Sequence, residues 1–183
     1  MLAIEKLNQF YGESHTLWDL DLEVPAGQCT CVMGRNGVGK TTLLKAVMGE
    51  VAIKSGELRY TAEAGEIELT KKAIEARSRL GIGDLSGGQQ QQLAIGRALV
   101  IEPKLLILDE PGEGIQPNIV AQIGQVIRQL INEDGLTVLL VEQKLPFARK
   151  YADRFVIMDR GRPVAKGEIS ELSNELIKQH LTV

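Results

Sequence analysis

The chain has 183 residues, of which 44% are hydrophobic and 25% charged, and its formal net charge is −3 at pH 7. A chain of this size can bury one sizeable core, so a single domain over residues 1–183 is expected. The acidic balance gives nucleic acid and anionic membranes no general attraction, and no apolar run approaches the roughly 20 residues of a membrane-spanning helix.

The N-terminal third of the sequence is typical of short strands. Candidate strands at 2–7, 20–24 and 57–60 are separated by turn residues, with no long helix among them, which predicts an antiparallel β layer. Residues 28–33 form another strand, on which Cys29 and Cys31 share one face. We interpret both as buried small hydrophobic residues and expect neither a metal cluster nor a disulfide.

Strands and helices alternate through the rest of the chain. Apolar runs predict strands at 28–33, 104–109, 136–141 and 154–158, and helical spacing of apolar residues predicts helices at 40–48, 88–100 and 117–133. A hairpin turn at 159–163 and a helix from Ser170 onward complete the pattern. The fold class is therefore α/β, with a mostly parallel sheet between flanking helices and the antiparallel β layer beside it.

The stretch GRNGVGKTT fits the pattern G-x-x-x-x-G-K-[ST], directly after one predicted strand and at the start of one predicted helix. Its glycines let backbone N–H groups turn toward phosphate oxygens, and the helix start adds partial positive charge. Lys40 supplies a cation and Thr41 a hydroxyl for Mg²⁺. A glycine turn with a chance lysine is the alternative, which the flanking elements disfavour. The predicted nucleotide-binding residues are Gly34, Arg35, Asn36, Gly37, Val38, Gly39, Lys40, Thr41 and Thr42.

Two acids follow the apolar run in LLILDEP, residues 105–111. They emerge at the carboxyl edge of the sheet, where α/β proteins bind ligands. Asp109 is predicted to hold Mg²⁺ directly or through water, and Glu110 to orient the attacking water in phosphoryl transfer. A solvated Asp-Glu pair is the alternative, and the phosphate loop beside it makes that interpretation the weaker one.

Together with these two motifs, LSGGQ at 85–89 and the following QQQLAIGRAL resemble the signature of the ATP-binding subunits of ABC transporters. The resemblance covers nearly the whole chain and implies a P-loop NTPase core, ATP and Mg²⁺ as cofactors, and ATPase activity. It also implies head-to-tail pairing of two subunits, in which the signature of one contacts ATP on the other. From the residues alone, Ser86 is expected to cap a helix that forms a second anion site. The signature residues assigned to ATP are Ser86, Gly87, Gly88 and Gln89.

The resemblance gives roles to two further residues. Tyr11 in QFYGESHTL occupies the place of an aromatic residue that stacks on adenine, although an ordinary partly buried tyrosine is the alternative. Gln143 in LLVEQKL replaces a histidine that contacts the γ-phosphate in many members. Glutamine carries no titrating proton, so a catalytic role by hydrogen bonding is expected and an acid–base role is not. Gly112 departs from the usual Thr or Ser, which removes a hydroxyl.

A segment of the family pattern is missing near residues 82–83. Only 46 residues separate Lys40 from Ser86, several dozen fewer than in the family that the chain resembles. After a segment like ARSRLGI the family continues into a glutamine loop and a helical subdomain, whereas Ile82 is followed at once by GDLSGG. A natural deletion, an engineered one and a sequence written without the segment stay open.

The sequence GEGIQP at 112–117 resembles the urea and branched-chain amino acid importer branch, with the signature region closest to the urea subunit. The implied partners are a second ATP-binding subunit and membrane permease subunits, with no nucleic acid and no direct contact with the transported solute. We expect a cytoplasmic protein, peripheral on the inner face of the membrane, since no secretory signal begins the chain. The alternatives are a hydrolysis-impaired, nucleotide-binding fragment and, less favoured, an ABC ATPase of DNA repair or translation.

Overall fold

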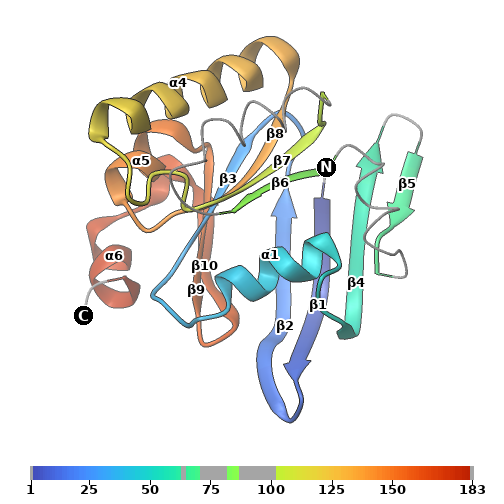
Figure 1. Ribbon diagram of the computed structural model, residues 1–183. Helices are drawn as coiled ribbons and strands as arrows, with labels where there is room; N and C mark the ends of the chain where they lie inside the picture. Colours follow the sequence, from blue (N-terminus) through green and yellow to red (C-terminus); the bar gives the residue numbers. More distant parts are fainter. Residues whose placement is uncertain (1, 63–64, 71–81, 87–101, 182–183) are drawn as a thin grey trace.

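The computed structural model describes residues 2–62, 65–70, 82–86 and 102–181, whose strands form two sheets (Figure 1). The smaller sheet contains β1 (Leu2–Tyr11), β2 (Ser14–Val24), β4 (Ile53–Ala62) and β5 (Gly65–Glu68), in the order β2-β1-β4-β5. The larger sheet contains β3 (Cys29–Met33), β6 (Ile82–Ser86), β7 (Leu105–Asp109), β8 (Thr137–Val141), β9 (Arg154–Asp159) and β10 (Arg162–Glu168), in the order β10-β9-β3-β8-β7-β6.

The two sheets differ in strand direction, as the sequence predicts. In the larger sheet β3 pairs in parallel with β8 and β9, and β7 pairs in parallel with β8 and β6. Only β10, joined to β9 by a hairpin, runs antiparallel on the edge of this sheet. In the smaller sheet β1 pairs antiparallel with β2 and with β4. The α/β class with an N-terminal antiparallel layer is confirmed.

The helices have sequence signals at their ends. They are α1 (Lys40–Met48), α4 (Pro117–Asp134), α5 (Leu145–Tyr151), the 3₁₀ turn η1 (Ile169–Glu171) and α6 (Asn174–His180). Gly49 and Gly135 end α1 and α4 in the left-handed conformation that glycine adopts at no steric cost. The helix expected from Ser170 begins at Asn174 instead, because the Ser173 hydroxyl accepts the Leu176 N–H as its cap.

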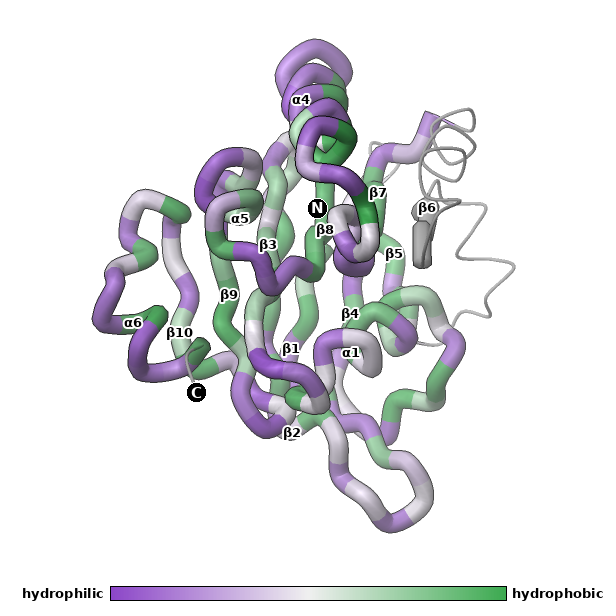
Figure 2. Tube along the Cα trace, turned by 60° about the vertical axis from the view of Figure 1, so that its left-hand side comes forward, coloured by the Kyte–Doolittle hydropathy of each residue, from purple (hydrophilic) through white to green (hydrophobic). Residues whose placement is uncertain are grey.

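The larger sheet is buried on both faces. Side chains alternate along its strands, so that Leu105 and Ile107 of β7 join one core and Leu106 and Leu108 join the other. The first core lies toward the smaller sheet and α1, and the second toward α4, α5 and α6. Figure 2 shows the hydrophobic strands of this sheet inside more hydrophilic turns. None of the described helices has the length and apolarity that a bilayer-spanning segment needs.

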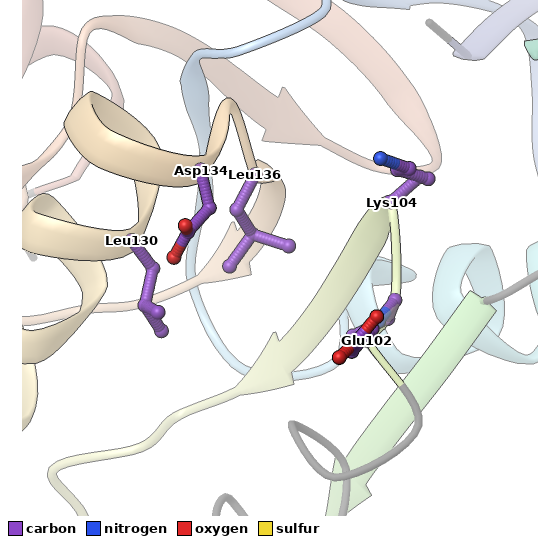
Figure 3. Close-up of a pocket in the computed structure, with 6 residues that line it drawn as sticks. Glu102, Lys104, Leu130, Asp134 and Leu136 are labelled. Carbon is purple, nitrogen blue, oxygen red and sulfur yellow. The ribbon is translucent and has the colours of Figure 1, made fainter. Parts of the chain in front are cut away.

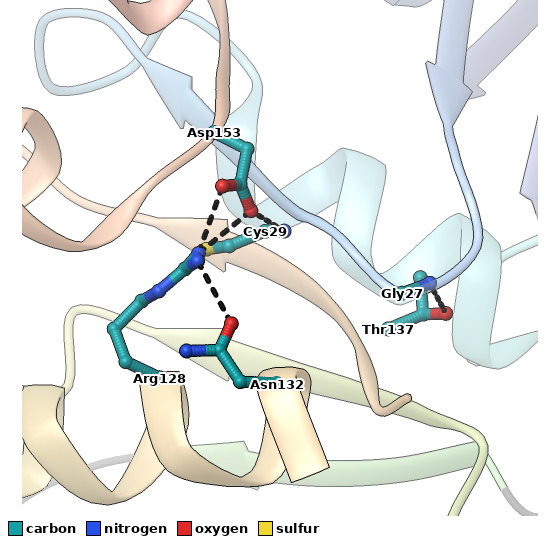
Figure 4. A network of polar contacts seen from close by, with 6 residues as sticks. All are labelled: Gly27, Cys29, Arg128, Asn132, Thr137 and Asp153. Atoms are coloured by element: carbon teal, nitrogen blue, oxygen red, sulfur yellow. Dashed lines mark hydrogen bonds and ion pairs between the residues drawn. The ribbon is translucent and has the colours of Figure 1, made fainter. Parts of the chain in front are cut away.

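A polar network fixes the amino ends of β3 and β9 to α4 (Figure 4). Arg128 Nη1 donates to the two carboxylate oxygens of Asp153 at 2.9 and 2.8 Å, and Asp153 Oδ2 accepts the Cys29 N–H at 2.7 Å. Cys29 and Cys31 are free thiols in the second core, as expected for small hydrophobic residues. Burial raises the pKa of Cys29 to about 12, so this thiol stays protonated at neutral pH.

The backbone passes through residues 82–83 as one strand. Ile82 pairs with Leu105 and Ser86 with Asp109 in a continuous parallel register. Residues 84–86, which lead into the helix that Ser86 is predicted to cap, are extended and form the end of this strand. The physical reason is that the outer edge of β7 offers unpaired backbone groups, which an extended segment can satisfy. The helix predicted at 88–100 and the signature residues Gly87, Gly88 and Gln89 lie outside the described residues.

Candidate functional site

The phosphate-loop motif lies between β3 and α1, as predicted, and two of its glycines are required by sterics. A Cβ on Gly34 would lie 2.5 Å from the Met158 carbonyl oxygen, and one on Gly39 would lie 2.9 Å from Leu17 Cδ2. Gly39 also has φ +106°, a backbone conformation that residues other than glycine rarely adopt. The loop therefore keeps its turn only with glycine at these two positions.

Lys40 lies inside this turn and not on the surface of α1. Its side chain is 6% exposed, and its ammonium donates to the carbonyl oxygens of Gly34 at 2.9 Å and Arg35 at 3.0 Å. Burial lowers the pKa of Lys40, while the nearby charges of Glu110 and Asp109 raise it. The loop thus holds a cation at its centre, where incoming phosphate oxygens can replace the two carbonyls as acceptors.

Thr41 and Asp109 meet at the carboxyl edge of the larger sheet. The Thr41 hydroxyl lies 3.5 Å from Asp109 Oδ2, although 68 residues separate them in sequence. Burial, followed by the charge of Glu110, raises the pKa of Asp109. A hydroxyl and a carboxylate oxygen are hard ligands suited to Mg²⁺, which takes one or two protein oxygens and completes its shell with phosphate and water. These two residues therefore fit the predicted metal.

Glu110, Gln143 and Asn36 come together beside the phosphate loop. The Gln143 side-chain amide donates to Asn36 Oδ1 at 2.7 Å and also to Glu110 Oε1. Glu110 has φ 47°, an uncommon value for a residue with a side chain, and its N–H donates to the Val141 carbonyl at 2.8 Å. Strain of this kind is often stored at functional sites, where the surrounding structure fixes it.

These residues line two small cavities. One, of about 170 Å³, is bounded by Thr16, Asn36, Gly37, Gly39, Lys40, Thr41, Thr42 and Glu110. The other, of about 340 Å³, is bounded by Met33, Gly34, Arg35, Asn36, Gln143 and Leu181. Most of the predicted nucleotide-binding residues therefore surround cavities at one sheet edge. Val38 is an exception, because its side chain packs into the first core.

Two other predicted residues stand apart from these cavities. Tyr11 ends β1 with 48% of its surface exposed and is not among the lining residues. Ser86 ends β6 opposite Asp109, so its backbone adjoins the carboxyl end of β7 in its own subunit. The stacking of Tyr11 on adenine therefore stays a prediction. The action of Ser86 across a dimer stays one as well.

Sequence reasoning missed Thr16, which lines the smaller cavity from β2. It also missed a stack of rings, in which His15 lies 3.9 Å from Phe10 and 3.5 Å from Trp18 between centroids. The Arg162 guanidinium lies 5.2 Å from the centre of the Trp18 ring. No motif marks these residues, because β10 and the β1–β2 hairpin meet only in the folded chain.

A further cavity lies at the opposite edge of the sheet (Figure 3). It measures about 380 Å³ and is bounded by Glu102, Pro103, Lys104, Leu130, Asp134 and Leu136. Ligands of α/β proteins bind beyond the carboxyl ends of the strands, whereas this cavity adjoins the start of β7. The phosphate-loop edge is therefore the candidate site.

Comparisons with known proteins agree with this geometry. The family model described as ABC transporter matches residues 17–82 and 62–113. The chain is 34% identical to the high-affinity branched-chain amino acid transport ATP-binding protein BraG of Pseudomonas aeruginosa, covering 90% of this chain and 91% of that protein. It is 28% identical to the glutamine transport ATP-binding protein GlnQ of Geobacillus stearothermophilus, covering 88% of each.

Solved structures share the fold. An ATP-binding cassette of an ABC transporter superposes with a TM-score of 0.86 at 22% identity, covering 98% of this chain and 97% of that one. A dimeric cassette in a post-hydrolysis state, bound to ADP and phosphate, superposes with a TM-score of 0.81 at 20% identity, covering 92% and 99%. The predicted P-loop ATPase fold is confirmed.

The comparison with BraG also bears on residues 82–83. That alignment runs over 213 positions, 30 more than the 183 residues of this chain. At least 30 of its positions are therefore gaps in this chain. The family model matches in two overlapping parts, 17–82 and 62–113, and not in one continuous part. Both observations agree with the interpretation that this chain lacks a segment that its relatives have.

Proposed function

This chain belongs to the ABC transporter family as an importer ATP-binding subunit with ATPase activity, and we propose that it drives the uptake of branched-chain amino acids. The observation that supports ATP hydrolysis is the meeting of Lys40, Asp109, Glu110 and Gln143 at one sheet edge. The similarity to BraG supports the class of solute. The solute itself does not contact this subunit, so its identity depends on that similarity.

In the proposed reaction, water attacks the γ-phosphate of ATP. The loop N–H groups and Lys40 would bind the phosphates, and Thr41 and Asp109 would hold Mg²⁺, which would neutralise phosphate charge. Glu110 orients and polarises the water, and Gln143 holds Glu110 through its side-chain amide. Because the chemistry depends mainly on positioning and charge, these groups supply the core of the cleavage step.

We further propose two kinds of partner. A second ATP-binding subunit would complete each site with its signature residues, and permease subunits would hold the chain at the inner face of the membrane. The dimeric cassette among the similar structures supports only the fold of such a pair. The net charge of −3 favours neither nucleic acid nor an anionic lipid surface as a direct partner.

Two alternatives follow from specific observations. Urea is the first, because GDLSGGQQQQLAIGRAL most resembles the urea subunit. The second is a nucleotide-binding fragment with impaired hydrolysis, because the glutamine loop is missing between Lys40 and Ser86. An ATPase of DNA repair or translation is less favoured, and salt-sensitive retention on DNA or ribosomes would revive it.

The test measures ATP binding and steady-state phosphate release on the same preparation. We expect saturable MgATP binding together with release of phosphate. Binding without release would favour the hydrolysis-impaired fragment. For the solute, the chain is reconstituted with importer permease subunits, and ATP-dependent uptake of leucine is compared with that of urea. Uptake of urea alone would overturn the amino acid assignment.

A further inference from the structure

Glu142, the residue after β8, is a buried acid next to the candidate site. Its side chain is 2% exposed, and Oε1 accepts the backbone N–H groups of Gln143 at 2.8 Å and Lys144 at 2.9 Å. Its own N–H donates to the Val32 carbonyl at 3.2 Å. One carboxyl oxygen thus fixes the backbone turn from which the Gln143 side chain projects.

Burying the Glu142 carboxyl group costs free energy, so this side chain does more than fill space in the core. The second oxygen, Oε2, is buried with no hydrogen-bond partner among the described residues. Burial raises the pKa of Glu142, and the two backbone hydrogen bonds oppose that rise. An unsatisfied buried acceptor costs about 1–3 kcal/mol, which an apolar side chain of similar volume would avoid. Glu142 therefore contributes mainly by its two hydrogen bonds to the turn.

Lys144, on the other side of Gln143, joins this turn to the loop after Glu110. Its ammonium donates to the Gly112 carbonyl at 2.6 Å. A Cβ on Gly112 would lie 3.1 Å from Val120, which is a tight contact, and 3.6 Å from the Lys144 ammonium, which is an ordinary one. The glycine that replaces the family's usual Thr or Ser thus avoids a tight contact with Val120 and lies beside the Lys144 ammonium.

We propose that Glu142 and Lys144 are positioning residues that hold Gln143 between Asn36 and Glu110. Glu142 sets the backbone of the turn, and Lys144 sets its distance from the loop that carries Glu110. Gln143 then keeps the Glu110 carboxylate in one orientation toward the attacking water. This inference rests on the proposed hydrolysis and extends it to two residues that contact neither nucleotide phosphate nor metal.

A double-mutant cycle tests the proposal by steady-state ATPase kinetics. Glu142→Ala should lower kcat about 10- to 100-fold, the scale of a misplaced catalytic group, and leave the KM for ATP within about twofold. Glu142→Gln, which keeps an acceptor oxygen, should recover most of that loss. In a Gln143→Ala background, Glu142→Ala should lower kcat no further, because its effect passes through Gln143. Fully multiplicative losses would overturn the proposal.

Lys144 is tested against a matched lysine. Lys144→Met should lower kcat by about threefold or more, whereas Lys150→Met, at another exposed site near the end of α5, should not. Equal effects of the two substitutions would contradict the role of Lys144.

A second measurement does not depend on turnover. The side-chain amide resonance of Gln143, assigned with Gln143→Ala, is followed by NMR in the full chain. Glu142→Ala should move it toward the position of a solvated glutamine, and Glu142→Gln should leave it near the parent position. An unchanged resonance in Glu142→Ala would overturn the inference. A shifted resonance without ATPase activity in the parent would instead support the positioning and reject the proposed hydrolysis.

Discussion

At the scale of single residues, the site places opposite charges in a confined space. Lys40 is buried between carbonyl oxygens, and the acids Asp109 and Glu110 lie near enough to raise its pKa against the effect of burial. Such a site is arranged for a ligand that brings its own negative charge and a metal ion. Three predictions follow from the individual groups, since each one contributes to a different step.

Lys40→Ala should weaken MgATP binding about 10- to 100-fold, because the phosphates lose the charged donor at the centre of the loop. Equilibrium titration with a fluorescent ATP analogue measures the change. Lys45→Ala is the control, since Lys45 is an exposed lysine of the same helix. Equal affinities in Lys40→Ala and the parent would remove the phosphate-loop assignment.

Glu110→Gln should keep MgATP affinity and slow hydrolysis about 100-fold or more, because an amide has nearly the shape of the carboxylate but polarises water poorly. Phosphate release and ATP binding are measured on the same samples. Glu113→Gln, an exposed acid three residues away, should behave like the parent. Unchanged turnover in Glu110→Gln would exclude Glu110 as the residue that orients water.

Asp109→Asn should stabilise the nucleotide-free protein at neutral pH. Burial and Glu110 raise the pKa of Asp109, so the folded state holds its proton more tightly than the unfolded state. The free energy of unfolding therefore falls as pH rises from about 4, the ordinary value, through the higher folded pKa. The free energy of unfolding is measured by denaturation in urea at pH 5 and at pH 8. The decrease between these two pH values should be smaller for Asp109→Asn than for the parent.

The exposed Asp134 at the end of α4 supplies the control, since Asp134→Asn should leave the pH dependence of unfolding as it is in the parent. A lower stability of Asp109→Asn than of the parent at pH 8 would contradict the expected sign. Its MgATP binding should weaken nonetheless, which separates the loss of a metal ligand from a loss of folding.

At the scale of elements, α4 and α5 pack closely because one residue has no side chain. Gly124 of α4 faces the ring of Tyr151 on α5, whose hydroxyl donates to the Ala121 carbonyl at 3.1 Å. A Cβ on Gly124 would lie 2.3 Å from that ring. The same pair of helices follows the loops that carry Glu110 and Gln143, so their spacing bears on the site.

Gly124→Ala should therefore destabilise the protein by about 1–2 kcal/mol, although alanine is the better helix former by about 1 kcal/mol. The overlap with Tyr151 outweighs that gain because both helices would have to shift. Gln125→Ala, on the exposed side of α4, should stay within about 0.5 kcal/mol of the parent. Thermal unfolding measures both, and a more stable Gly124→Ala would show that the helices separate freely.

At the scale of the whole molecule, strand β6 of the larger sheet runs through residues 82–83 without interruption. The strand β6 pairs with β7, which ends at Asp109, and Asp109 lies beside Thr41 at the start of α1. Nucleotide binding depends on that core. The family resemblance implies that a helical subdomain docks on the permease, and it places that subdomain in the missing segment.

Inserting a family-like glutamine loop and helical subdomain between Ile82 and Gly83 should raise ATP turnover and permease-coupled uptake while leaving MgATP affinity nearly unchanged. The inserted glutamine would help to place water and metal, which is most of what this chemistry needs. Intact-mass spectrometry comes first, to show whether the polypeptide has only the 183 residues of the sequence. If it has, and already hydrolyses ATP and couples as well as the extended chain, the segment is dispensable.

The sequence by itself determined the parts of the protein that are contiguous along the chain. The phosphate loop is one strand, one turn and one helix in succession, and the sterics at Gly34 and Gly39 depend on that local geometry. The alternation of apolar runs gave the α/β class, because period-two and helical spacings bury different faces. Asp109 and Glu110 could be placed at the sheet edge because they follow a buried strand.

The tertiary structure alone decided which distant groups meet. Gln143 reaches Asn36, 107 residues earlier, because β8 lies between β3 and β7 in the sheet. Thr16 enters the cavity from the smaller sheet, and Glu142 is buried by strands that the motif patterns do not specify. The order of the strands depends on how both cores pack together. The spacing of residues along the sequence does not specify that order.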